Sequence, residues 1–155
     1  MGAVTTYTYD KAGNLLKKVT ADQSTWSYIY DPNGQLVSYT DGDGKQTSYT
    51  YDALKRLTEV KEAGITKLTY TYDALSRVTA ATDANGQKTQ YEYDAVGNRT
   101  AIVNANGVRT AFHYDKNGQL TQKTYANGYK ESYAYDAQGN LIQQTDSTGL
   151  ETAYD

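Results

Sequence analysis

The chain has 155 residues, a formal net charge of -3 and an isoelectric point near 5.1, so it has the size of one domain and no basic excess with which to bind nucleic acid. It has no cysteine, which excludes disulfides, thiolate metal sites and a cysteine nucleophile. No stretch approaches the roughly 18 apolar residues that would predict a membrane span. Tyrosine is unusually abundant, with 17 residues against one Phe and one Trp, so tyrosine must supply most of the buried area.

A repeat of 21 residues explains the tyrosine content. A leading strand is expected over Thr5 to Tyr9, and the dipeptide Tyr-Asp then recurs without insertion or deletion. A second aromatic column lies two residues before each Tyr-Asp, so that all but three of the 17 Tyr fall in two columns. The Tyr-Asp pairs are Tyr9-Asp10, Tyr30-Asp31, Tyr51-Asp52, Tyr72-Asp73, Tyr93-Asp94, Tyr114-Asp115 and Tyr135-Asp136.

Two turn signals punctuate each repeat. The first follows Tyr-Asp, where five repeats place glycine three residues after the Asp, at Gly13, Gly34, Gly97, Gly118 and Gly139. The second is typified by Asn104-Ala105-Asn106-Gly107, and Asn-Gly between two strand-like runs is a strong hairpin signal because the turn needs a positive φ. Each repeat is therefore predicted to run turn, strand, turn, strand.

The runs between turns alternate with period two, as in Lys88 to Tyr93, which places the two tyrosines on one face of a strand and Gln90 and Glu92 on the other. The predicted fold is all-β: a continuous strip of antiparallel β-hairpins with about fifteen strands, no helix longer than one turn, and the form of a curved section of a larger shell. Residues 5–155 are interpreted as a single array of seven repeats and a fragment of a longer protein, and residues 1–4 as a start added for expression.

Three positions depart from the repeat. Lys55 and Ser76 replace the first turn glycine, and because a non-glycine residue with positive φ costs about 1 kcal/mol, these turns are predicted to be right-handed and different from the glycine turns. Arg99 replaces an aliphatic column residue, where its charge would face the packed side unless the stem extends to solvent, and Arg99→Leu is expected to stabilise the protein. The second turn also varies: Gln23 stands at its glycine position in repeat one, and Gly64-Ile65 is shifted in repeat three.

The recurring residues favour structural roles. Each Asp is predicted to open its turn by accepting hydrogen bonds from nearby backbone N–H groups, rather than to form a carboxylate ladder for sugars or cations. Equivalent residues of successive repeats lie two strands apart, about 10 Å, which is too far for a shared metal or a catalytic dyad. The tyrosine columns are expected to pack against themselves and the aliphatic column, with a sugar-stacking platform as the alternative.

Other candidate sites are weak. The acidic stretch Asp41 to Lys45 fails as a calcium loop because Lys45 stands where a third oxygen ligand belongs, and it is interpreted as a turn. His113, the one histidine, is expected to be a surface residue, and Trp26 to fill a local gap. No catalytic, cofactor-binding or metal-binding residues are predicted, and no cofactor is expected.

The unit Tyr-x-Tyr-Asp-x-x-Gly-Asn-Leu, present as Tyr133 to Leu141, resembles the YD repeat of bacterial Rhs proteins, toxin-complex subunits, wall-associated proteins and animal teneurins. The segment Tyr72 to Val78 resembles the second common form of that repeat, and the resemblance covers residues 5 to 155. It implies a strip of hairpins that spirals into a hollow shell, which in toxin members holds a toxic domain. Some members were also proposed to bind carbohydrate.

The functional expectation is a wall segment of an Rhs/YD-repeat shell that encapsulates a toxin or effector domain, with no catalysis of its own. The alternative is a carbohydrate-binding or cell-surface adhesion module that uses the tyrosine face, although the off-column aromatics do not recur in register; they are Tyr39, Tyr125, Tyr129 and Trp26. The expected partners are further YD repeats of the parent chain or a second copy through edge strands, and an encapsulated toxin domain or a glycan. A secreted or cell-surface location is expected, with no signal peptide in the chain.

Overall fold

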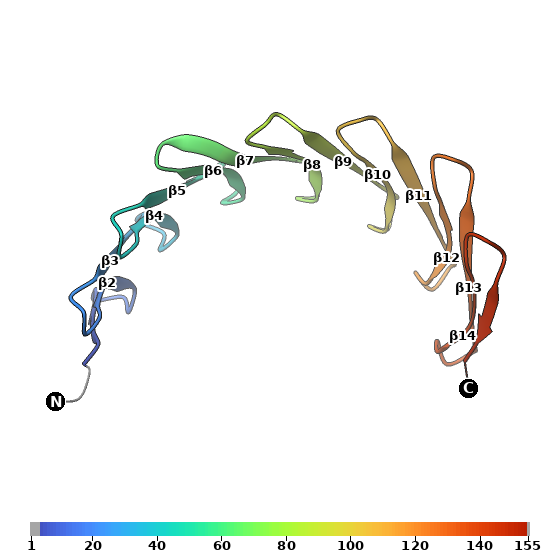
Figure 1. The fold of residues 1–155 in the computed structure, drawn as a ribbon, viewed down its shortest axis with the longest axis horizontal. Helices are drawn as coiled ribbons and strands as arrows, with labels where there is room; N and C mark the ends of the chain where they lie inside the picture. Colours follow the sequence, from blue (N-terminus) through green and yellow to red (C-terminus); the bar gives the residue numbers. More distant parts are fainter. Residues whose placement is uncertain (1–3, 155) are drawn as a thin grey trace. The chain divides into compact units, whose positions relative to one another are not determined.

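The computed structural model describes residues 4–154, which form fifteen strands and no helix. The strands neighbour one another in sequence order from β1 to β15 in one antiparallel sheet, which confirms the predicted strip (Figure 1). The prediction for residues 1–4 lies outside the described residues, except for the exposed Val4. The strands are β1 (Thr6–Tyr9), β2 (Leu15–Val19), β3 (Thr25–Tyr30), β4 (Leu36–Thr40), β5 (Gln46–Tyr51), β6 (Leu57–Glu62), β7 (Ile65–Tyr72), β8 (Val78–Asp83), β9 (Lys88–Tyr93), β10 (Arg99–Val103), β11 (Arg109–Tyr114), β12 (Leu120–Thr124), β13 (Lys130–Tyr135), β14 (Leu141–Thr145) and β15 (Glu151–Ala153).

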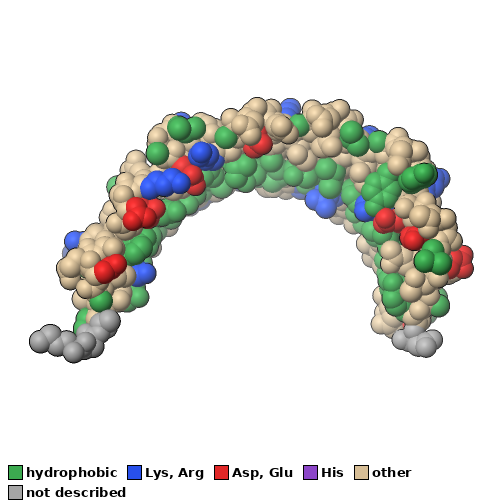
Figure 2. Space-filling view, viewed as in Figure 1, with side chains coloured by type: hydrophobic (Ala, Val, Ile, Leu, Met, Phe, Trp, Pro, Cys, Tyr) green, Lys and Arg blue, Asp and Glu red, His purple; other side chains and the backbone are tan. Residues whose placement is uncertain are grey.

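The chain forms two compact units, one running to Ser76 with Ala81–Gly86 added, the other comprising Arg77–Ala80 and the chain from Gln87 onward. Within each unit the successive hairpins are rotated against one another rather than lying flat (Figure 1). The rotation gives the sheet of each unit an inner and an outer side, and hydrophobic side chains gather on the inner side (Figure 2). The tyrosine columns thus face one side of the sheet, as the period-two alternation of β9 requires.

The sheet is a single layer with little conventional core. Among the described residues the buried apolar side chains are Ala80 and Ala101, and Ala101 is 0% exposed. Ala101 pairs with Glu92 on one side and Ala111 on the other, and an ion pair between Arg109 and Glu92 spans this part of the outer face at 2.7 Å. Because no large side chain among residues 4–154 is fully buried, aromatic rings and hydrogen bonds supply much of the stability that a thick core gives other folds.

Strand pairing differs at the two ends of each hairpin. We call the two strands joined by a Tyr-Asp turn a Tyr-Asp hairpin, and the turn that leads to the next hairpin a linking turn. In the hairpin of β3 and β4 the pairing reaches Tyr30 and Leu36 through a bulge. Across the following linking turn, β4 and β5 pair only from Thr40–Gln46 to Ser38–Ser48. Backbone hydrogen bonds therefore do not join neighbouring hairpins near their Tyr-Asp turns, and side chains must join them there.

Repeat three has a different linking turn, as its shifted glycine predicts. Ala63 and Gly64 both have positive φ, at 48° and 79°, and Glu62 pairs directly with Ile65. Two central residues with positive φ define the two-residue hairpin turn that matches strand twist. The other linking turns are longer: in Asn104 to Val108, for example, only Gly107 has positive φ, at 77°.

Candidate functional site

The Tyr-Asp turn is organised by its aspartate. In the first repeat, Oδ1 of Asp10 accepts the backbone N–H groups of Ala12 and Asn14, both at 2.8 Å. The backbone closes the same loop, since Asp10 N donates to Asn14 O and Gly13 N donates to Asp10 O. This is a five-residue loop in which the fourth residue has positive φ, the geometry of a turn followed by a glycine bulge. The loops are residues 10–14, 31–35, 52–56, 73–77, 94–98, 115–119 and 136–140.

The prediction that Lys55 and Ser76 adopt right-handed turns is wrong. Both have φ of 64°, close to the 80° of Gly34. In the first of these loops Asp52 Oδ1 accepts the N–H groups of Leu54 and Arg56, and Lys55 N donates to Asp52 O. These bonds define the loop whichever residue stands at its fourth position, and they offset a left-handed cost of about 1 kcal/mol.

Most linking turns use the same chemistry. Asp41 Oδ1 accepts the N–H groups of Asp43 and Lys45, so the acidic stretch is a turn, as its sequence indicates. Asn104 does the same with Asn106 and Val108, both at 3.0 Å. Both turn types are thus built on an Asx side chain that satisfies two backbone donors.

The tyrosine hydroxyls join neighbouring hairpins. Oη of Tyr51 donates to the carbonyl oxygen of Leu36 at 2.8 Å, and Oη of Tyr93 donates to that of Val78 at 2.9 Å. The acceptor lies in the preceding hairpin, at the position where backbone pairing between hairpins has stopped. The same bond recurs from Tyr72 to Leu57, from Tyr114 to Arg99 and from Tyr135 to Leu120. The hydroxyl thus finds the partner that a packed tyrosine needs.

The fifth residue of the Tyr-Asp turn provides a second link. Arg56 donates through Nε to its own Asp52 at 2.7 Å and through Nη1 to the backbone carbonyl of Asp73 at 3.0 Å, and its guanidinium carbon lies 4.6 Å from the ring centroid of Tyr72. Arg77 repeats this arrangement one hairpin further on: Nη1 donates to the carbonyl of Asp94 at 2.8 Å and the guanidinium lies 4.7 Å from the Tyr93 ring. We call this arrangement the arginine strap.

Asparagine at the same position closes its own turn instead. Nδ2 of Asn98 donates to Asp94 Oδ2 at 2.9 Å, and Asn14 and Asn140 bond Asp10 and Asp136 in the same way. Glutamine is long enough to reach the next turn: Gln35 donates to the carbonyl of Lys55 at 3.1 Å, and Gln119 to that of Gly139 at 3.3 Å. Side-chain length at one column therefore decides whether consecutive turns are linked.

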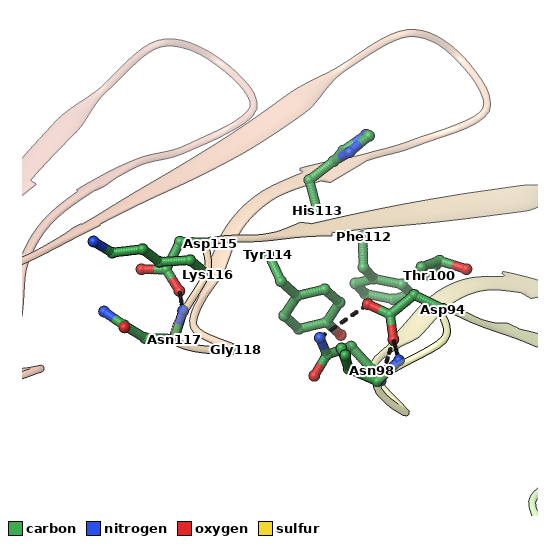
Figure 3. A pocket seen from close by; sticks show the side chains of 11 residues that line it. Asp94, Asn98, Thr100, Phe112, His113, Tyr114, Asp115, Lys116, Asn117 and Gly118 are labelled. Atoms are coloured by element: carbon green, nitrogen blue, oxygen red, sulfur yellow. Dashed lines mark hydrogen bonds between the residues drawn. The ribbon is translucent and has the colours of Figure 1, made fainter.

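Cavities lie between consecutive Tyr-Asp turns. The larger, of about 610 Å³, lies between the turns of Asp94 and Asp115 and is lined by Asn98, Phe112 and Tyr114 among others. Figure 3 shows the rings of Phe112 and Tyr114 directed toward Asp94 and Asn98, while the side chains of Lys116 and His113 point away. A second cavity, of about 410 Å³, lies between the turns of Asp31 and Asp52 and includes Gln35 and Lys55 in its lining.

Hydrogen bonds lower the pKa of several turn aspartates. The side-chain bond from Asn14 lowers the pKa of Asp10, and that from Asn140 lowers the pKa of Asp136. Desolvation is the largest influence on Asp94 and opposes ionisation, but bonds from Asn98 and from turn backbone N–H groups outweigh it and lower the pKa. All of these bonds come from within the turn, which leaves the carboxylates without the arrangement of an acid and base pair.

A hydrogen-bonded cluster around Glu131 occurs in a single repeat. Glu131 accepts the hydroxyl groups of Tyr125 at 2.6 Å and Tyr133 at 2.8 Å, and Lys123 lies 3.5 Å from it. The hydroxyl of Tyr125, followed by that of Tyr133, lowers the pKa of Glu131. Desolvation and the bond to Glu131 raise the pKa of Tyr133 to about 12.

The remaining off-column residues also pack locally. Lys18 lies 4.5 Å from the Trp26 ring centroid, and a Cβ on Gly42 would lie 3.0 Å from that ring, so Trp26 packs against the Gly42 backbone. Tyr39 stacks with Tyr28 at 6.1 Å between ring centroids. The Arg99 side chain is exposed, with its guanidinium 5.8 Å from the rings of both Tyr91 and Phe112.

The linking role of the fifth turn residue was not predicted from the sequence, although a signal was present. Every residue in that column carries a planar N–H donor, as an amide or a guanidinium: Asn14, Gln35, Arg56, Arg77, Asn98, Gln119 and Asn140. In residues 4–154 no group of three His, Asp or Glu side chains is placed to hold a metal ion. The described chain also contains no helix with the length and hydropathy to cross a membrane.

Comparison with solved structures shows the same fold in toxin complexes. A crystal structure of TcdB2-TccC3-Cdc42 superposes with a TM-score of 0.79 at 16% identity, covering 93% of this chain and 9% of that chain. A Tc holotoxin pore from Photorhabdus luminescens superposes with a TM-score of 0.73 at 22% identity, covering 96% of this chain and 9% of that one. The chain therefore spans less than a tenth of the length of these toxin-complex chains.

A search of curated proteins found no match. The Teneurin YD-shell family model, in contrast, matches residues 3–64 and, in a second overlapping alignment, residues 19–155. Together the two alignments cover nearly the whole chain, including the Tyr-Asp turns and the strands between them. The chain belongs to the YD-shell family that this model describes.

Proposed function

We propose that this chain is a structural wall section of a YD-repeat shell that encloses a toxin or effector domain, and that it performs no catalysis of its own. The observation that carries the proposal is the use made of the recurring residues. Each turn Asp binds its own backbone, and the hydroxyls of five Tyr-Asp tyrosines bind a carbonyl of the preceding hairpin, as Tyr93 binds Val78. The Asp carboxylates therefore shape the turns, and the Tyr hydroxyls hold one hairpin to the next.

The YD-shell family match and the fold shared with toxin-complex chains support a shell role for the parent protein, which we propose to be secreted or displayed at a cell surface. The test uses the full-length protein that carries this chain. We expect its enclosed domain to resist a protease concentration that degrades the same domain expressed alone. Equal degradation rates in the two settings would refute enclosure.

The wall itself is tested in the same assay by weakening its links. The double variant Arg56→Asn and Arg77→Asn removes both arginine straps and should speed degradation of the enclosed domain. Lys11→Gln is the matched control, because Lys11 is an exposed residue of a Tyr-Asp turn. A double variant that protects as well as the wild type would show that the straps do not maintain the wall.

We further propose that the edge strands β1 and β15 pair with further YD repeats or with a second copy of the chain. Both strands are exposed along their length, and free strand edges are templates for pairing. Light scattering should show particles larger than 17.1 kDa that become smaller in the variant Thr8→Lys with Thr152→Lys. A 17.1 kDa particle at every concentration would contradict edge pairing.

Carbohydrate binding remains the second candidate, because the rings of Phe112 and Tyr114 line a cavity beside the Asp94 carboxylate. Aromatic faces beside polar side chains offer stacking and hydrogen bonds to a sugar. A glycan array separates the candidates: a wall section should bind no sugar reproducibly, whereas adhesion requires a sub-millimolar ligand. Loss of that ligand in Tyr114→Leu would establish the adhesion function.

A further inference from the structure

Two arginine straps define what the space between consecutive Tyr-Asp turns accommodates. The guanidinium of Arg56 rests on the Tyr72 ring, its Nε binds the carboxylate of Asp52, and its Nη1 binds the carbonyl of Asp73. That carbonyl also accepts the turn bond from Ser76 N at 3.1 Å, so it serves two donors at once. An aromatic face, a carboxylate in the preceding turn and a carbonyl in the following turn together form a guanidinium site.

The second strap places its guanidinium in the same way. Arg77 lies over the Tyr93 ring, and its Nη1 donates to the carbonyl of Asp94, which also accepts Gly97 N at 3.3 Å. Because the ring contact and the carbonyl contact recur at Arg56 and Arg77, the site is a property of the repeat. It requires only that a side chain of sufficient length occupy it.

The same three groups surround the cavity between the turns of Asp94 and Asp115, but no arginine of this chain fills it. Asn98 stands at the fifth turn position and donates to its own Asp94. The ring of Tyr114, the Asp94 carboxylate and the turn of Asp115 all line the cavity of about 610 Å³. Asp115 O accepts Gly118 N at 3.1 Å, as the strapped carbonyls accept their own turn bonds.

We propose that this cavity binds the guanidinium group of an arginine side chain from a partner polypeptide. The group stacks on the Tyr114 ring and donates to the Asp115 carbonyl and to the Asp94 carboxylate, reproducing in trans the contacts that Arg56 makes in cis. The proposal concerns a binding site and stands independently of the shell function proposed above.

Charge and geometry favour arginine over other groups. The lining contains two carboxylates, Asp94 and Asp115, and one cation, Lys116, whose side chain points away from the space between the turns (Figure 3). Two arginines lie outside the lining: Arg77 donates to the carbonyl of Asp94, and the exposed Arg99 guanidinium is 5.8 Å from the Phe112 ring. The His113 side chain also points away. A lysine ammonium lacks the planar fork that lets one group stack on a ring and donate sideways to a carbonyl.

The other cavity provides an internal control. Between the turns of Asp31 and Asp52, Gln35 already donates to the carbonyl of Lys55, and Lys55 itself lines the space. An additional cation is disfavoured there by the Lys55 charge. Ring signals of Tyr51 should therefore stay unchanged under conditions that shift those of Tyr114.

The test titrates N-acetyl-L-arginine amide into the whole chain while NMR follows the ring signals of Phe112, Tyr114 and Tyr51. We expect a saturable shift at Phe112 and Tyr114 with a millimolar dissociation constant, and no shift at Tyr51. Free L-arginine and N-acetyl-L-lysine amide are run in parallel. Absence of a saturable shift, or an equal shift with the lysine probe, would overturn the proposal. A response to free L-arginine but not to N-acetyl-L-arginine amide would show that the ligand is the free amino acid and not a residue of a polypeptide.

A variant that fills the site in cis completes the test. Asn98→Arg should abolish the response to the probe and raise Tm by roughly 2 °C, because it recreates the strap of Arg56. Asn140→Arg is the matched control, since no Tyr-Asp turn follows it within the described residues 4–154, and it should change neither quantity. An Asn98→Arg variant that still responds to the probe, or that is no more stable than the wild type, would overturn the proposal.

Discussion

The Tyr-Asp turns at residues 52–56 and 94–98 share one backbone but differ in what they connect. In both, the Asp carboxylate accepts backbone N–H groups two and four residues later, and the fourth residue has positive φ, at 64° for Lys55 and 104° for Gly97. In the first, the fifth residue, Arg56, reaches the following turn, whereas in the second Asn98 turns back to its own Asp94. The repeat thus separates two tasks: the Asp shapes the turn, and the fifth residue sets the link between hairpins.

Acidification should have the largest effect, because it acts on every Tyr-Asp turn whose Asp pKa is lowered. Asp10, Asp52 and Asp136 have lower pKa values in the folded protein than the value of 3.8 that is normal for Asp. Such groups contribute stability that is fully present above the unfolded pKa. That stability is lost as the pH falls through the folded pKa values. Urea unfolding at pH values between about 6 and about 2 should therefore show that the free energy of unfolding falls at the acid end. A pH-independent stability would show that these bonds do not favour the ionised form.

The next largest effect should come from converting a strapped turn into an asparagine turn. Arg56→Asn removes the contact with Tyr72 and the bond to the Asp73 carbonyl, and should lower the free energy of unfolding by about 1–2 kcal/mol. Chemical denaturation measures the change. Lys11→Gln should stay within about 0.5 kcal/mol of wild type. Equal effects from the two variants would remove the distinction between the turns.

A smaller change tests whether the two turns truly share a backbone. Gly97→Lys places lysine where Lys55 stands in the strapped turn, at a site where an added Cβ meets no atom within 4 Å. The cost should therefore be the left-handed backbone alone, roughly 1 kcal/mol. Loss of several times that amount in thermal denaturation, or loss of the fold, would mean that the Gly97 turn cannot adopt the Lys55 geometry.

The smallest expected effect is at Arg99, which lies beside the unstrapped region. Its guanidinium is exposed and 5.8 Å from each of two rings, near the outer limit of a useful cation–π contact. Arg99→Leu restores the aliphatic column and should raise stability by roughly 0.5 kcal/mol. A lower Tm in this variant would show that its contacts with Tyr91 and Phe112 matter more than the column packing.

The periodic features were predictable because they follow from local chemistry. The 21-residue spacing, the period-two alternation and the Asx turns each depend on a few consecutive residues, and they led to the strand count and to the role expected of Asp94. The right-handed turn predicted at Lys55 is wrong because the intrinsic φ preference of lysine does not include the hydrogen bonds that Asp52 accepts in the turn. The link from Arg56 to Asp73 depends on the bulge and on where hairpin pairing stops, and neither is visible in the residue pattern.

The most direct test of the separate linking role is a pair of double-mutant cycles. One cycle combines Arg56→Asn with Tyr72→Leu, and the other combines Asn98→Ala with Tyr114→Leu, each measured by chemical denaturation. The account predicts a coupling energy of about 1 kcal/mol in the first cycle and a value near zero in the second. Absence of coupling between Arg56 and Tyr72, or equal coupling in both cycles, would contradict it.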